Sequence, residues 1–245
     1  MKPETAVKYG KGSSQFLAMG AIVLAEADLQ SSLSLFSEAR TERGHAKTFR
    51  KFSENNDKDN FVLTKLLSKK SVRFVAVALH KPSLAGSHIR SNPQKEYQYL
   101  VKFTLERISW VARDAARGGH PDQNCCRVFF SEQKTYPYED LCEYLNKLQH
   151  GRDRHNCSVE WAYIDEKIGY AKHKNEDPIH FGDLVASAFH RAIEPKEHEM
   201  VDDRFFRNLL PAIYSKNGKR HGLKLFPPRQ IDEICARGEL SFLKL

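Results

Sequence analysis

The sequence has no long apolar run and no dense set of cysteines. No stretch approaches the roughly 18 apolar residues of a membrane-spanning helix, and the start, Met1-Lys2-Pro3-Glu4, lacks the apolar core of a signal peptide. The five cysteines fit neither a zinc spacing nor a disulfide framework. We therefore expect a cytoplasmic protein with reduced thiols and no membrane-spanning segment.

Several common catalytic motifs are absent as well. The sequence contains no Gly-x-Gly-x-x-Gly after an expected strand, no Gly-Lys-Ser/Thr phosphate loop, no Gly-x-Ser-x-Gly and no His-Glu-x-x-His. No internal repeat or low-complexity linker divides the chain. These absences argue against the dinucleotide-binding, P-loop, serine-hydrolase and zinc-protease classes.

Positive charge is present in excess. The chain has 39 Lys and Arg against 31 Asp and Glu, a formal net charge of +8. Its hydrophobic content of 40% is ordinary for a globular protein. A basic balance of this kind favours a polyanionic partner, nucleic acid (DNA or RNA) first and an anionic membrane surface second.

Apolar patterning predicts strands that alternate with helices. Strands are expected at 15–24, 72–79, 127–130 and 159–164, and helices at 29–43, 58–69, 94–117, 137–149 and 181–192. Two further helical patterns cover 205–214 and 231–240. Such alternation predicts one α/β domain with an at least partly parallel sheet. We expect a loose lead-in over 1–14, the domain over 15–227, and a helical extension over 228–245.

The segment 181–192 has the clearest helical pattern. Its apolar residues follow the i, i+3, i+4, i+7 spacing of one helix face, and Asp183, Ser187 and His190 fall on the opposite face. A helix beginning at 181 would place Asp183 in its first turn. There the carboxylate either stabilises the helix dipole or faces a metal ion, and the pattern alone leaves both interpretations open.

Acidic residues also follow two expected strands. Glu132 comes after 127–130, Asp165 comes after 159–164, and Asp183 begins the next helix. Carboxylates at successive strand ends are the layout of a site for two divalent metals, Mg²⁺ or Mn²⁺, in phosphodiester cleavage. The competing interpretation is that these are solvated loop acids.

Basic residues that could contact phosphate occur near these acids and in the segment around Phe49 and Phe52. The candidates for nucleic-acid contact are Lys47, Arg50, Lys51, Lys134 and His190.

An ordered set of short motifs runs through most of the chain. It comprises Val128-Phe129-Phe130-Ser131-Glu132, Tyr138-Glu139-Asp140-Leu141, Tyr144-Leu145, Gly182-Asp183-Leu184-Val185-Ala186-Ser187-Ala188-Phe189, Arg191-Ala192, Glu194-Pro195 and Gly222-Leu223-Lys224-Leu225-Phe226-Pro227. Residues 128–227 with these motifs resemble the C-terminal half of the bacterial family known as domain of unknown function 3800. Segments 16–24 and 72–79 resemble that family's second and third core strands.

This resemblance implies a ribonuclease H-like α/β fold, with a mixed central sheet flanked by helices and acidic residues that hold two magnesium ions. The chain departs from the family pattern in three places. It lacks the Asp-Glu-Ser-Gly motif of the first strand, it has no acid within 46–52, and Ser131 stands where the family has Asp, with Glu132 beside it. Asp183 alone matches cleanly.

Two functions follow as expectations. The first is a metal-dependent nuclease, or a degenerate relative that acts on nucleic acid, in which Asp183 and Glu132 are catalytic and bind metal with Asp165 as a third ligand. The alternative is a non-catalytic nucleic-acid-binding or protein-interaction module of a mobile-element or phage-defence locus. Either the chain has lost the acidic site or its true start lies upstream. Without the family's first strand, a homodimer or a partner chain is expected to cover an exposed sheet edge.

Overall fold

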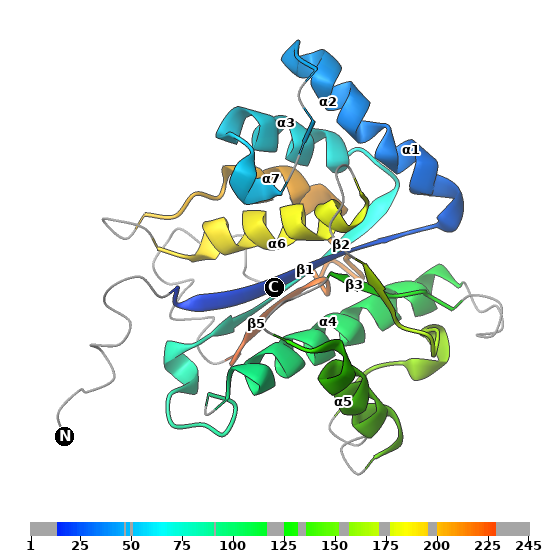
Figure 1. Cartoon of the computed structure of the whole chain (residues 1–245), viewed down its shortest axis with the longest axis vertical. Helices are drawn as coiled ribbons and strands as arrows, with labels where there is room; N and C mark the ends of the chain where they lie inside the picture. Colours follow the sequence, from blue (N-terminus) through cyan, green and yellow to red (C-terminus); the bar gives the residue numbers. More distant parts are fainter. Residues whose placement is uncertain are drawn as a thin grey trace.

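The computed structural model describes most of the chain as an α/β arrangement of helices around a small sheet (Figure 1). The described residues are 14–46, 48–49, 51–90, 92–116, 125–131, 136–151, 157–171, 177–195 and 200–228. The expected lead-in over 1–14, apart from Ser14, and nearly all of the expected extension over 228–245, including the helical pattern at 231–240, lie outside them.

The strands are β1 (Phe16–Leu24), β2 (Val72–His80), β3 (Phe129–Ser131), β4 (Gly169–Ala171) and β5 (Leu223–Phe226). The α-helices are α1 (Leu29–Leu33), α2 (Leu35–Arg43), α3 (Asp57–Leu67), α4 (Pro93–Ala115), α5 (Tyr138–His150), α6 (Ile179–Ile193) and α7 (Arg204–Leu209). Short 3-10 helices are η2 (Glu26–Asp28), η3 (Phe52–Glu54), η4 (Pro82–Leu84), η7 (Trp161–Tyr163) and η9 (Leu210–Ala212).

The sheet is mixed, and its parallel pair agrees with the expectation of an at least partly parallel sheet. Its order is β1-β2-β5, with β1 antiparallel and β5 parallel to β2. A separate parallel pair joins β3 to β4. The guanidinium of Arg127, just before β3, donates to the carboxylate of Glu26, just after β1, at 2.6 Å. The start of the β3–β4 pair therefore lies beside the end of β1.

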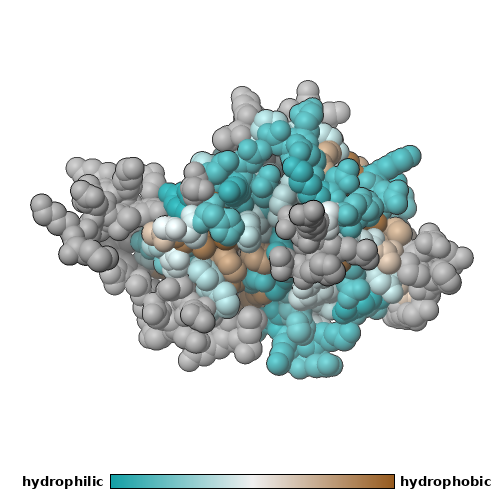
Figure 2. Space-filling model, turned by 90° about the horizontal axis from the view of Figure 1, so that it is seen from below, coloured by the Kyte–Doolittle hydropathy of each residue, from teal (hydrophilic) through white to brown (hydrophobic). Residues whose placement is uncertain are grey.

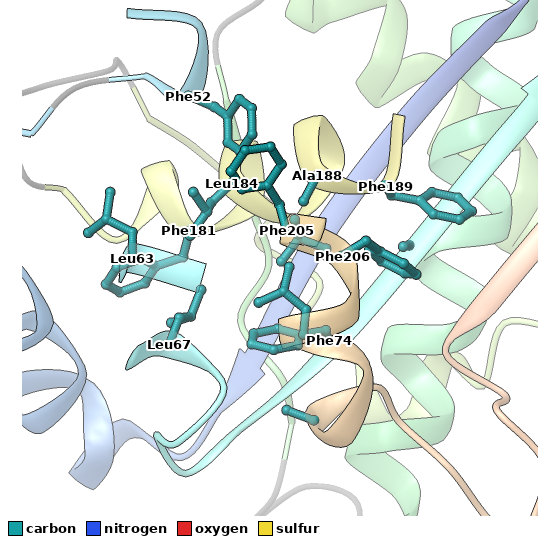
Figure 3. Packing of buried hydrophobic residues seen from close by; sticks show 14 of the residues in the cluster. Phe52, Leu63, Leu67, Phe74, Phe181, Leu184, Ala188, Phe189, Phe205 and Phe206 are labelled. Carbon is teal, nitrogen blue, oxygen red and sulfur yellow. The ribbon is translucent and has the colours of Figure 1, made fainter. Parts of the chain in front are cut away.

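Strand β2 divides the core into two layers because its side chains alternate between the faces of the sheet. Phe74, Ala76 and Ala78 belong to the cluster formed with α2, α3, α6 and α7 (Figure 3). Val75, Val77 and Leu79 belong to the cluster formed with α4 and α5. Helix α6 lies on one side of the sheet and α4 on the other (Figure 1), so the protein has the layered form of an α/β domain.

Helix α6 packs on β1 at unusually close range. A Cβ atom on Gly20 would lie 2.3 Å from the backbone nitrogen of Ala186 and 2.7 Å from the carbonyl oxygen of Gly182. Only glycine at position 20 allows this approach, since real Cβ contacts are never so short. Phe181, Leu184 and Phe189 of α6 belong to the buried cluster that includes residues of α3 and α7 (Figure 3).

Strand β1 lies at the edge of the sheet, although its sequence is that of an interior strand. Apart from Phe16 its residues are only partly buried, yet side chains on both faces pack against the two core clusters. No described strand pairs with its outer edge. The pattern predicts a strand buried on both faces; both faces do contact the core, but only Phe16 is fully buried. The pattern does not reveal the open edge, because pairing depends on a neighbouring strand.

The expected strand at 159–164 is wrong. Residues 161–163 form η7, in which the backbone N–H of Tyr163 donates to the carbonyl of Glu160 at 3.0 Å. Only Ile164 makes a β-bridge, to Cys126, and the strand itself forms later, at β4. Glu160 explains the change, because its N–H is taken up by Ser109 Oγ at 3.0 Å and is unavailable to a ladder.

Other boundaries shift by a few residues. The pattern at 29–43 divides into α1 and α2 at Ser34, and Gly44 ends α2 at φ 65°, as expected of a stop signal. The pattern at 205–214 forms only α7 and η9. Strand β5 has no counterpart among the predicted strands. No helix within the described ranges combines the length and the apolar character needed to cross a membrane.

Candidate functional site

Asp183 lies in the second turn of α6, because the helix begins at Ile179 rather than at 181. The expectation of a first-turn carboxylate is therefore wrong. Its Oδ2 accepts a hydrogen bond from the backbone N–H of Phe52 at 2.9 Å. Phe52 is the first residue of η3, and the N–H of a first helical residue has no partner within its own helix. The partly buried carboxylate thus fastens the start of η3 to α6.

The same hydrogen bond positions Phe52, the residue that directly follows the basic segment 47–51. Phe49 is 1% exposed and stacks near Phe36, with ring centroids 6.3 Å apart. Phe52 is 3% exposed and packs edge-on against Phe205. Two buried aromatic anchors therefore flank Arg50 and Lys51 in the sequence. Lys51 is partly exposed and is the residue that precedes η3.

His190 lies two turns further along the same face of α6. Its Nε2 is 2.7 Å from Ser14 Oγ and 3.5 Å from Glu194 Oε2. Burial lowers the pKa of His190, although the nearby Glu194 carboxylate acts in the opposite direction. The structure therefore favours a neutral imidazole bound to the start of β1.

Glu194 is the centre of that arrangement, and the sequence pattern does not single it out as a site residue. Its Oε1 accepts from the N–H of Gln15 at 2.8 Å, and its Oε2 accepts from the N–H of Phe16 at 2.9 Å. Ser14 Oγ donates to Oε2 at 2.7 Å. Its position after α6 in the Glu194-Pro195 motif was the available signal. The contacts assign Glu194 and His190 to holding β1 against α6.

Asp165 lies away from α6, in the connection between η7 and β4. Its Oδ1 accepts from the backbone N–H of Lys167 at 2.8 Å, so it closes a local turn. It lines a cavity of about 460 Å³ between α5 and this connection, together with Tyr138, Cys142, Leu145, Asn146, Gln149, His150, Trp161, Ile164, Glu166, Lys167 and Ile168. Asp165 and Asp183 thus engage different parts of the chain.

Four of the expected site residues lie outside the described residues. They are Glu132, Lys47, Arg50 and Lys134. Ser131, the last residue of β3, is the nearest described neighbour of Glu132 in the sequence.

The described carboxylates do not fit a divalent metal site. One oxygen of Asp183 is committed to Phe52 and one oxygen of Asp165 to Lys167. Across the ranges that the structure describes, no group of three or more His, Cys, Asp or Glu side chains is placed to hold a metal ion. A site for two Mg²⁺ or Mn²⁺ ions needs several converging carboxylates.

Cys125, Cys126, Cys142 and Cys157 form no disulfide. Burial raises the pKa of the Cys126 thiol to about 11, so this thiol is protonated at neutral pH and is a poor nucleophile.

Comparisons with known proteins identify no relative of this chain. No family model, curated protein or solved structure matches the chain.

Proposed function

We propose that this chain is a ribonuclease H-like protein that binds nucleic acid, DNA or RNA, through the basic segment 47–51 and that its described carboxylates do not cleave it. The observation that carries the choice of binding over cleavage is the hydrogen bond from Phe52 to Asp183. It gives the one carboxylate that matches the family motif a positioning role, because Asp183 binds Phe52, the residue directly after the basic segment.

Charge supports a polyanionic partner. The net charge of +8 attracts phosphate backbones at long range. Seen from below, on the side of α4 and α5, hydrophilic residues cover much of the described surface, with apolar residues between them (Figure 2). Lys47 precedes Phe49 in the sequence, and Arg50 and Lys51 lie between Phe49 and Phe52, a spacing of basic residues suited to tracking a phosphate backbone.

The ribonuclease H-like assignment is part of the same proposal. Its support is the resemblance of the ordered motifs, together with a mixed sheet that carries α6 on one face and α4 on the other. The outer edge of β1, with which no described strand pairs, suits a further strand of that fold or a partner chain. A divalent metal would require Glu132 and further acids, so no catalytic step is assigned to it.

Binding can be measured by fluorescence anisotropy with labelled single-stranded and double-stranded DNA and RNA across a salt series. We expect affinity to fall steeply as salt rises, since bound phosphates release counterions. Changing Lys47, Arg50 and Lys51 together to Gln should weaken binding and reduce the slope of log affinity against log salt by about 2 to 3 on duplex DNA.

The matched control changes the exposed residues Lys65, Lys69 and Arg207 to Gln, which removes three positive charges from outside the segment 47–51. An equal loss of affinity in both triple variants would show that the loss depends only on net charge and not on the segment 47–51. An absence of binding to any nucleic acid at about 50 mM salt would refute the proposal. Cleavage that needs Mg²⁺ or Mn²⁺ and disappears in Asp183→Asn would restore the nuclease interpretation.

A protein-interaction role for a mobile-element or phage-defence locus is the second candidate. The C-terminal helical pattern that suggests it, at 231–240, lies outside the described residues.

A further inference from the structure

Positive side chains gather on the face of the sheet opposite α6, where α4 crosses β5. Lys224 is the only charged residue of β5, and its neighbours there are Leu223, Leu225 and Phe226. Its Nζ lies 3.7 Å from the centroid of the Phe103 ring and 3.9 Å from Glu106 Oε2. Lys102 Nζ lies 5.4 Å from the same Phe103 ring. Two lysines from distant parts of the chain therefore share one aromatic side chain.

Arg107 adds a third cation to the group. Its side chain is 10% exposed, and its guanidinium carbon lies 4.9 Å from the Trp110 ring. One of its terminal nitrogens donates to Glu106 Oε2 at 3.3 Å. Its Nε is buried and has no hydrogen-bond partner among the residues that the structure describes. A buried guanidinium N–H without an acceptor is costly, because its water has been removed and nothing replaces it.

Among the described residues, the carboxylate of Glu106 offsets part of this positive charge. Glu106 is 6% exposed at its side chain and is the acidic group that contacts both Lys224 and Arg107. Its other oxygen accepts from the backbone N–H of Ser158 at 3.2 Å. Lys102, Arg107 and Lys224 carry +3 and Glu106 carries −1, which leaves +2 in a half-buried group. Aromatic rings attract cations but do not neutralise them.

The electrostatic strain is visible in Lys224. Burial, together with the positive charges of Arg107 and Lys102, lowers the pKa of its ammonium to about 8, although Glu106 acts in the opposite direction. An anion among these cations would relieve the repulsion and supply an acceptor for Arg107 Nε.

We propose that Lys102, Arg107 and Lys224 form a binding site for a phosphate group beneath α4, separate from the segment 47–51. A tetrahedral phosphate offers several acceptor oxygens and up to two negative charges, which match the surplus of +2. The phosphate comes either from a small phosphate compound or from the backbone of a nucleic acid, and the experiment distinguishes these sources.

Trp110 provides the readout, because Arg107 stacks on its ring and the chain has only one other tryptophan, Trp161. In a Trp161→Phe background, inorganic phosphate is titrated at constant ionic strength with chloride as the balancing anion. We expect a saturable change in Trp110 fluorescence and, by NMR of labelled lysine side chains, a rise in the pKa of Lys224. Chloride alone should produce neither change.

Substitutions test which of the cationic side chains bind phosphate. Lys224→Met should weaken phosphate affinity by about tenfold, since it removes one charge-assisted hydrogen bond. Lys102→Gln, at a partly exposed position, should weaken it less while leaving the unfolding midpoint unchanged. The matched control is Lys95→Met, a partly buried lysine on α4 outside this group. If phosphate and chloride have equal effects, or if Lys224→Met binds phosphate as tightly as Lys95→Met, the site does not exist.

A short single-stranded oligonucleotide replaces phosphate in the second arm. A change in Trp110 fluorescence at lower concentration than with inorganic phosphate assigns the site to a nucleic-acid backbone, and a response to inorganic phosphate alone assigns it to a small phosphate compound. The response to inorganic phosphate should persist when Lys47, Arg50 and Lys51 are changed to Gln. Failure of this site and failure of the proposed binding segment therefore give different results.

Discussion

At the scale of single residues, Asp183 owes its role to one hydrogen bond. The partner of its carboxylate is the backbone N–H of Phe52, 131 residues earlier in the chain. The helical pattern of 181–192 predicts correctly that Asp183 lies outside the apolar face of α6. It does not identify what the side chain meets, because η3 reaches α6 only in the folded chain.

Removing this acceptor tests the positioning role. Asp183→Ala should lower the free energy of unfolding by about 1 to 3 kcal/mol, because the N–H of Phe52 loses its partner in a partly buried place. Asp183→Asn keeps an acceptor oxygen and should lose less. Urea denaturation measures both, with Ser187→Ala on the same helix face as the control. Equal stability of Asp183→Ala and the unchanged chain would exclude the role.

The free energy of unfolding is expected to depend on pH through the titration of His190. Burial places the pKa of its folded form below the ordinary value of 6.5. Between these two pKa values the unfolded chain binds more protons than the folded chain, so stability rises with pH. The stabilisation is therefore present above pH 6.5 and is lost as the pH falls through the folded pKa. The groups that face the ring are Ser14, Glu194 and Lys81.

We expect the unfolding midpoint in urea to decrease as the pH falls below about 6.5, and to decrease less in His190→Gln. NMR titration of the imidazole measures the pKa directly. The exposed His88 serves as the control position for substitution. A folded pKa at or above the ordinary value would contradict the expected direction.

At the scale of elements, β1 is an edge strand with interior character. In the antiparallel pairing with β2, Lys81 N–H donates to Gln15 O, so odd-numbered residues of β1 direct their backbone groups toward β2. Even-numbered residues direct theirs toward the outer edge. At Phe16 these groups meet Ser14 and Glu194, and beyond it Ala18, Gly20, Ile22 and Leu24 face an edge that no described strand covers.

Hydrogen exchange should therefore alternate along β1. Amides of Ala18, Gly20, Ile22 and Leu24 should exchange faster than those of Leu17, Met19, Ala21 and Val23, which pair with β2. Amide exchange followed by NMR resolves the two sets. Equal protection in both sets would mean that another strand covers the edge, from a homodimer or a partner chain, and dilution would then distinguish the two.

At the scale of the whole molecule, the acids that the sequence places at successive strand ends serve separate parts of the fold. Asp183 binds η3, and Asp165 closes a turn near α5. Positive charge instead gathers around the one carboxylate of Glu106, on the opposite side of the sheet from α6. From these described residues we expect binding of anions rather than of divalent cations.

Divalent metal should accordingly have little effect on stability. We expect the thermal unfolding midpoint to be the same with millimolar Mg²⁺ or Mn²⁺ and with EDTA, since ligands stabilise only in proportion to their binding to the folded state. Differential scanning fluorimetry at constant ionic strength measures this. A rise in the midpoint that is lost in Glu132→Gln, but not in Glu139→Gln, would establish a metal site at Glu132.

The sequence by itself determined most helices, the long strands β1 and β2, and the basic balance of the chain, because periodicity and composition act locally. Short elements were harder to predict from the sequence. The segment 159–164 alternates like a strand, but the N–H of Glu160 donates to Ser109 Oγ and η7 forms instead. Tertiary structure alone decided that β5 pairs with β2, that Asp183 meets Phe52, and that Lys224 meets Glu106. Each of these contacts joins distant segments, and the cost or gain of a buried charge depends on the partners that folding brings to it.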